Sequence, residues 1–93
     1  MEKLRERYDG ARTPGGQVIS AQCDASTGQL SIWWIERRGR RNVSHPISVV
    51  LKPTAHTYEV TTFVDADSGK RLICTDLSAA CAAIDEQIQI QAG

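Results

Sequence analysis

The feature that most constrains the fold is a run of strand-forming residues from Gln29 to Leu51, the longest such stretch in the sequence. β-Branched and aromatic side chains dominate the run, and they alternate with the two-residue period of a β-strand. Near its middle, four arginines surround Gly39 and divide the run into two alternating segments. The run therefore predicts a long β-hairpin with a positively charged tip.

The first half of this hairpin is apolar on both faces. Leu30, Ile32 and Trp34 alternate with side chains that include Trp33 and Ile35. A sheet covered by a helix on one side buries only one of these sets, so we expect an uncovered apolar face. Its expected members are Trp33, Ile35, Val50 and Phe63. Such a face favours contact with a protein partner or with a second copy of the chain.

Three further strands are expected, at residues 17–23, 57–64 and 71–75, where short apolar runs are bounded by turn residues. Two of the connecting turns, Asp24–Gly28 and Asp65–Gly69, both begin Asp-Ala and end in Gly. An aspartate that accepts backbone N–H groups is typical of such hairpin turns. Pro46 lies within the expected third strand, 42–51, and indicates either a sheet edge or a β-bulge there.

From Leu77 the apolar residues recur at three and four positions, which predicts a C-terminal helix with Asp76 as its N-cap. We expect residues 89–93 to fray. Residues 1–16 are expected to form a short, loosely attached N-terminal helix and a flexible, glycine-rich linker. Residues 17–93 then form a single α+β domain.

The predicted architecture is α+β, with a five-stranded antiparallel meander and the C-terminal helix packed on one face. A small SH3-like barrel closed by the helix is the alternative, because five short strands with tight turns can curl. The expected core combines apolar residues of the strands and the helix: Val18, Leu30, Ile32, Trp34, Val49, Leu51, Tyr58, Val60, Leu72, Leu77, Cys81, Ile84 and Ile88.

Charge is balanced overall but divided along the chain. Residues 1–52 carry nine basic and five acidic side chains, whereas residues 53–93 carry two basic and six acidic ones. This division predicts an electric dipole that biases partner choice and association.

The cysteines and the apolar pattern predict where the protein is found. Three cysteines without disulfide-scaffold spacing favour a reducing cytoplasm. The sequence has neither a signal-peptide pattern nor an apolar run of about 18 residues, so we expect no membrane contact.

The hairpin tip is the strongest candidate binding site. Arginine contacts phosphates and tryptophan stacks on bases, so a ribbon that carries both side chains suits nucleic acid. A charged hairpin tip is more often a solvated turn that discourages edge pairing, and a protein contact is the third alternative. The candidate binding residues are Trp33, Ile35, Arg37, Arg38, Arg40 and Arg41.

No metal, cofactor or catalytic site is expected. The cysteines and histidines form no close pair of the kind with which zinc sites begin. Asp65, Asp67 and Gly69 match the start of a calcium loop, but the later ligands are missing. Ser44 and His45 are neighbours in one strand, so they point to opposite faces and do not form a nucleophile–base pair. We therefore expect a protein that is not an enzyme.

Two general resemblances accompany this interpretation. The C-terminal hairpin, which runs into the helical segment LSAACAAIDEQI, looks like the three-strand-plus-helix modules of some DNA-binding proteins. In size and build the chain is similar to single-domain accessory proteins of phages and integrated elements, including defence inhibitors and integron cassette products. These resemblances imply a small accessory binding module. The leading hypothesis is contact with a protein partner or a homodimer, and the alternative is nucleic-acid binding through the basic hairpin.

Overall fold

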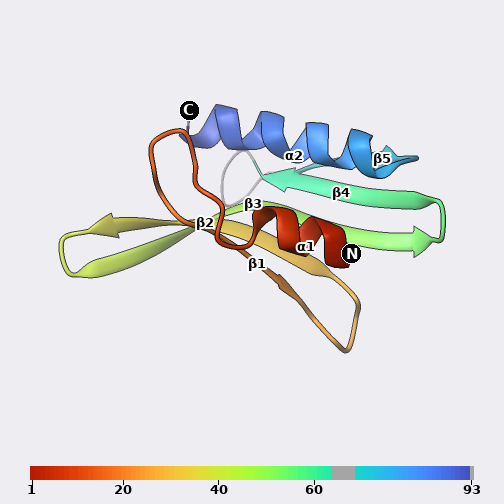
Figure 1. Cartoon of the computed structure of the whole chain (residues 1–93), viewed down its shortest axis with the longest axis horizontal. Coiled ribbons are helices and arrows are strands. Elements are labelled where there is room, and N and C mark those ends of the chain that lie inside the picture. The colour runs from red at the N-terminus through yellow and green to blue at the C-terminus, as the bar shows by residue number, and fades with distance from the viewer. Residues whose placement is uncertain (64–68, 93) are drawn as a thin grey trace.

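The computed structural model describes residues 1–63 and 69–92 and shows an α+β fold (Figure 1). Its elements follow one another in the order α1 (Glu2–Tyr8), β1 (Ile19–Cys23), β2 (Leu30–Arg38), β3 (Arg41–Thr54), β4 (Thr57–Phe63), β5 (Gly69–Cys74) and α2 (Leu77–Ala92). The predicted strands and the predicted C-terminal helix are therefore present.

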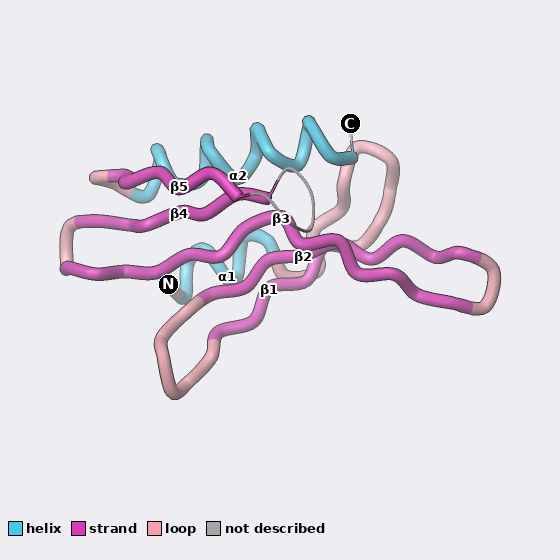
Figure 2. The backbone as a smooth tube through the Cα atoms, turned by 180° about the vertical axis from the view of Figure 1, so that it is seen from behind, coloured by secondary structure: helices cyan, strands magenta, loops and turns pink. Residues whose placement is uncertain are grey.

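The five strands form one antiparallel sheet in the order β1-β2-β3-β4-β5, in which every strand pairs with its neighbours in the sequence. This confirms the predicted meander. Strands β1 and β5 lie at the two edges, so the described sheet is open rather than closed into the alternative barrel. Both helices lie on the same side of it (Figures 1 and 2), and their apolar side chains join those of the strands in a single core.

A β-bulge in the central strand decides which residues of β3 face the helices. Ile32 pairs with Ser48, whereas Trp33 pairs with Pro46, so Ile47 is the extra residue. Ile47 and Ser48 are consequently both buried. Pro46 thus lies at a bulge, one of the two situations that the sequence indicates for a proline within a strand.

Because of the bulge, the residues of β3 that face the core are not the ones predicted from the sequence. Val50 pairs with Leu30 and Val60 and is fully buried in the core, although we expected it on the uncovered face. Val49 and Leu51, which we expected in the core, lie on the opposite face and are half-buried. One inserted residue exchanges the two sets because side chains along a strand alternate between faces.

The N-terminal segment is also more firmly packed than expected. Leu4 is fully buried and Tyr8 nearly so, and both belong to the main core. Backbone hydrogen bonds join Gly10 to the carbonyl of Ile19, and Ile19 to the carbonyl of Ala11. The prediction that the N-terminal helix is loosely attached is therefore wrong. These same bonds place Ile19 in the core in place of Val18, which is 38% exposed.

The rest of the predicted core is largely confirmed. Leu30, Ile32, Trp34, Val60, Ile84 and Ile88 are buried, and Tyr58, Leu77 and Cys81 pack against them. Leu72 is 36% exposed, because it lies in the edge strand β5. Core residues that the sequence prediction omitted are Leu4, Tyr8, Ile19, Ala21, Ile47, Val50, Cys74 and Ala80.

Local chemistry explains where the elements begin and end. Asp24 Oδ1 accepts the backbone N–H of Ser26 at 2.8 Å, and Gly28 closes the turn at a φ of 72°. Asp76 Oδ1 accepts the N–H of Ala79 at 2.7 Å and caps α2, as predicted. Residues 65–68 of the second Asp-Ala turn, and residue 64 of the expected strand before it, lie outside the described residues.

Candidate functional site

Strands β2 and β3 continue beyond the rest of the sheet as a two-stranded arm, residues Ile35–Ser44 (Figure 2). Strand β1 accompanies β2 only as far as Trp34, and the pairing of β4 with β3 begins at Ser48. No third strand pairs with the arm in the described ranges 1–63 and 69–92, and the molecule extends 43 Å along its longest axis and 25 Å along the next. At its base, the Ile35 N–H donates to the carbonyl of Val18 at 3.1 Å.

The arm ends in a tight two-residue turn. Arg38 and Arg41 are directly paired, which leaves Gly39 and Arg40 as the central residues. Gly39 has a φ of 59° and no described non-glycine residue has a positive φ, so the geometry is that of a type II′ turn with glycine in its first central position. The four predicted arginines are consequently held at the far end of the arm.

The four arginines do not act as one cluster. Arg37 and Arg38 are successive residues of β2 and point to opposite faces of the arm. The Arg38 Nε donates to Glu36 at 2.8 Å, which neutralises that charge locally. Within residues 1–63 and 69–92, Arg37, Arg40 and Arg41 make no ion pair, and all three are exposed. Three guanidinium groups thus remain available for a partner.

The arm face that continues the helix-covered side carries a chain of polar contacts. The rings of Trp34 and His45 stack with centroids 4.3 Å apart, and His45 Nε2 lies 2.7 Å from Glu36 Oε2. The Arg38 hydrogen bond, followed by that of His45, lowers the pKa of the Glu36 carboxyl below its ordinary value. These contacts fix the side chains at the base of the arm, and they cover the ring of Trp34.

The opposite face of the sheet carries partly exposed apolar side chains. Trp33 and Ile35 lie there as expected, and Trp33 pairs with Pro46. Phe63 is on the same face, since a Cβ placed on its partner Gly69 would contact both Phe63 and Thr61. The half-buried or exposed apolar residues of this open face are Trp33, Ile35, Pro46, Val49, Leu51, Phe63 and Ile73.

Two glutamines of α2, which the sequence analysis overlooked, join the helix to the base of the arm. Gln87 donates to the Phe63 carbonyl at 2.6 Å, and Gln91 donates to the carbonyls of Pro46 and Phe63. Gln91 Oε1 also accepts the Trp34 indole N–H at 3.0 Å. The expectation that residues 89–93 fray is therefore wrong for residues 89–92. The spacing of four between the glutamines, beside Ile84 and Ile88, was the available sequence signal.

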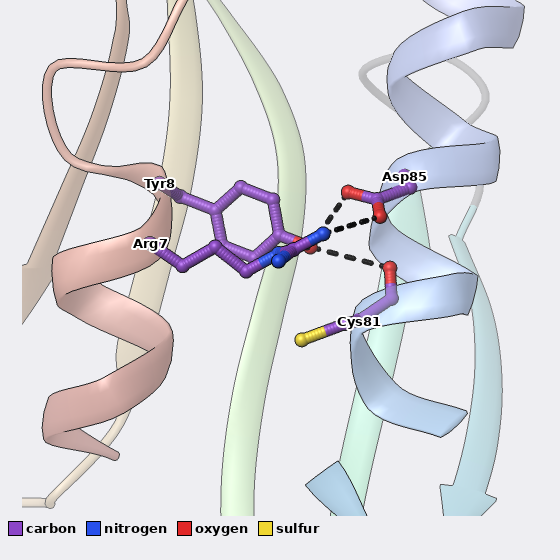
Figure 3. A network of polar contacts seen from close by, with 4 residues as sticks. All are labelled: Arg7, Tyr8, Cys81 and Asp85. Carbon is purple, nitrogen blue, oxygen red and sulfur yellow. Dashed lines mark hydrogen bonds and ion pairs between the residues drawn. The ribbon is translucent and has the colours of Figure 1, made fainter. Parts of the chain in front are cut away.

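A second polar network joins the two helices (Figure 3). Arg7 Nη2 lies 3.0 Å from Asp85 Oδ2, and the Tyr8 hydroxyl donates to Asp85 Oδ1 at 2.7 Å and lies 3.2 Å from the Cys81 carbonyl. Burial raises the pKa of Tyr8, and its bond to the Asp85 carboxylate raises it further. The network thus fixes α1 against α2 through groups that are 77 residues apart in the sequence.

An open hollow of about 590 Å³ lies beside this network, and Arg7, Arg12, Pro14 and Gln89 are among the residues that line it.

The residues considered for catalysis in the sequence do not come together. Ser44 and His45 pair with Ile35 and Trp34 respectively, so they face opposite sides of the arm. No group of three or more potential metal ligands occurs among the residues that the structure describes. Neither described helix has the length and apolar character needed to cross a lipid bilayer.

The comparisons add no relative from which a role could be transferred. No protein-family model, curated protein or solved structure matches the chain. Function is therefore inferred from the two surfaces described above: the open face of the sheet and the arginine-bearing arm.

Proposed function

We propose that this protein is a non-enzymatic binding module that associates through the open face of its sheet, and that the occupant of this face is a second copy of the chain. One observation carries the proposal: apolar side chains from β2, β3, β4 and β5 lie together on the face that neither helix covers. Single exposed apolar residues are common on protein surfaces, but a contiguous patch typically marks an interface.

The strand register makes these residues neighbours. Trp33 lies beside Pro46, and Val49 lies between Ser31 and Thr61 in the next row. Leu51 pairs with Glu59, which in turn pairs with Ile73. The apolar side chains are thus distributed over successive rows of the sheet rather than confined to one edge. Burying such a surface contributes a favourable hydrophobic free energy of about 25 cal/mol for each Å² of apolar area, part of which offsets the entropy lost on association.

The charges on the open face also suit self-association. Glu59 lies between Leu51 and Ile73 within the patch, and its Oε1 pairs with Arg71 Nη1 at 3.2 Å in the same molecule, so the two charges neutralise each other. Val49 lies between Ser31 and Thr61, whose side chains are hydroxyls, and the row continues through Thr61 to Arg71, which is neutralised by Glu59. Two such faces meet without an unpaired like charge at their centre, as the inner faces of a β-sandwich do. A stable dimer of standard size requires about 800 Å² from each partner.

The biological setting is a separate proposal. An accessory role in a phage or mobile element, and a cytoplasmic location, rest on the size, composition and cysteine content of the chain. Neither is needed for the proposed self-association.

Light scattering on a sizing column tests the proposal. The chain should elute at twice its 10.2 kDa mass, with dissociation on dilution. Ile73→Lys places a charge on the open face, and Ile90→Lys is the matched control on α2, because the two isoleucines are 61% and 64% exposed. Ile73→Lys should raise the dissociation constant at least about ten-fold, and Ile90→Lys should leave it unchanged.

Two results would overturn the proposal. One is a mass of 10.2 kDa at every concentration up to the solubility limit. The other is dissociation by Ile90→Lys while Ile73→Lys remains a dimer, which would place the interface on the helices.

A further inference from the structure

We infer that the β2–β3 arm binds duplex DNA, with its three unpaired arginines on the phosphates and in the groove. This inference does not rest on the proposed self-association, because the three arginines lie beyond the rows of the sheet that form the apolar patch, and Ile35 at the base of the arm is the one residue named in both. It uses side chains that make no ion pair within the described parts of the chain.

The shape of the arm matches a groove. A two-stranded β-ribbon fits the major groove of B-DNA, which is about 12 Å wide and about 8.5 Å deep. Among the described residues, Ile35–Arg38 and Arg41–Ser44 form a strand pair with no other strand beside it, and the Ile35 N–H bond to Val18 lies at its base. At about 3.3 Å for each residue, the ribbon is about 13 Å long before its turn. The tip can therefore reach the floor of the groove before the sheet meets the backbone.

The side chains of the arm supply the required contacts. Arg40 lies in the turn, and Arg37 and Arg41 lie on opposite faces, so cations face more than one direction around the tip. Asn42, which pairs with Arg37, is exposed on the same face. Arginine and asparagine are the side chains that most often form paired hydrogen bonds with guanine and adenine edges. Phosphate attraction then supplies affinity, and this face supplies the groups that contact bases.

The arrangement favours a duplex over a single strand. Binding of single strands relies on aromatic side chains that stack with unpaired bases. Trp34 is covered by His45 and bonded to Gln91, and the arm itself, Ile35–Ser44, contains no aromatic ring, since the partly exposed Trp33 lies below it on the open face of the sheet. The arm thus offers charge and hydrogen-bond donors without an exposed stacking platform.

The charge distribution orients the approach. Helix α2 contains Asp85 and Glu86 and no lysine or arginine. A polyanion is therefore repelled from the helix and attracted to the arm, although the formal net charge of the chain is zero.

The experiment measures anisotropy of a fluorescent mixed-sequence duplex, two helical turns long, across a series of salt concentrations. The arm variant combines Arg37→Gln, Arg40→Gln and Arg41→Gln. The control combines Lys3→Gln, Lys52→Gln and Lys70→Gln, which removes the same charge from exposed positions outside the arm. Since each neutralised phosphate contributes about 0.9 to the salt slope, the arm variant should reduce its magnitude by about 2 to 3 and weaken low-salt binding at least about ten-fold. The control should keep the parent slope.

Several outcomes would overturn the inference: no duplex binding by the parent at low salt, equal loss in the two triple variants, or tighter binding of the parent to a single strand of the same sequence. Light scattering and circular dichroism of each variant separate this result from the proposed function. An arm variant that is folded and dimeric but does not bind DNA supports the arm as the site. A monomeric parent that binds DNA with the expected slope refutes only the self-association.

Discussion

The two faces of the sheet are built from the same five strands, yet one is buried beneath the helices and the other is partly exposed. On the covered face, Leu30, Val50 and Val60 are fully buried beneath the helices. On the open face, Trp33, Val49 and Leu51 are also apolar but remain partly exposed. The apolar content of a strand therefore does not determine its burial. What determines burial is where α1 and α2 are attached, and this difference separates stability from binding within one sheet.

The largest expected effect on the free energy of unfolding comes from replacing a leucine with alanine on the covered side of the sheet, and the comparison is the same replacement on the open face. Leu4→Ala removes a fully buried side chain of α1 and should lower the free energy of unfolding by about 3 kcal/mol. Leu51→Ala removes the same atoms from the half-buried open face and should cost about 1 kcal/mol or less. Denaturant unfolding at one low protein concentration measures both changes. Equal losses would contradict the division of roles between the two faces.

An intermediate effect is expected where α2 meets the base of the arm. Gln91→Ala removes the acceptor for the Trp34 indole and the donor to two backbone carbonyls, and should destabilise the fold by about 1 to 2 kcal/mol. Gln89→Ala is the matched control, because Gln89 is exposed on the same helix. Thermal unfolding of the two variants should differ clearly. If Gln89→Ala were as destabilising as Gln91→Ala, helix propensity rather than these bonds would be responsible.

The smallest effect concerns the protonation of Glu36 on the helix-side face of the arm. Its pKa in the folded state lies below the ordinary value of 4.5, so its contacts stabilise the fold above that pH and are lost as the pH falls through the folded pKa. A carboxyl-carbon NMR titration should give a midpoint below 4.5, and Arg38→Gln, which removes the largest cause, should move it upward. A parent midpoint at or above 4.5 would show that the contacts with Arg38 and His45 do not form in solution.

The order of the elements was predictable because strand and helix periods extend over several residues. The faces of β3 were not predictable, because a bulge leaves no trace in the alternation. Pro46 indicated a disturbance of the ladder but not the side on which Ile47 would be accommodated. Two apolar residues in α1 also could not show that Leu4 would be fully buried, since this depends on the space that α2 leaves on the sheet.

The candidate site was predictable to a similar degree. Trp33 and Ile35 on the open face follow from alternation alone, and so does the Glu36–Arg38 ion pair, because residues two apart in a strand share a face. The contact between His45 and Glu36 requires the register of β2 against β3. The bonds of Gln91 require the position of the Phe63 carbonyl, which belongs to another strand. Tertiary placement, rather than local pattern, provides these contacts.

The link between the two helices has a consequence for the order of folding. Each strand pairs only with its neighbours in the sequence, so the sheet can assemble hairpin by hairpin as the chain is synthesised. Tyr8 is different, because its partner Asp85 is made 77 residues later. The Tyr8 hydroxyl of α1 therefore gains its carboxylate acceptor only after nearly the whole domain has left the ribosome. Helix α1 can pack against β1 early, and the hydrogen bond from Tyr8 to Asp85 is the later contact that completes the fold.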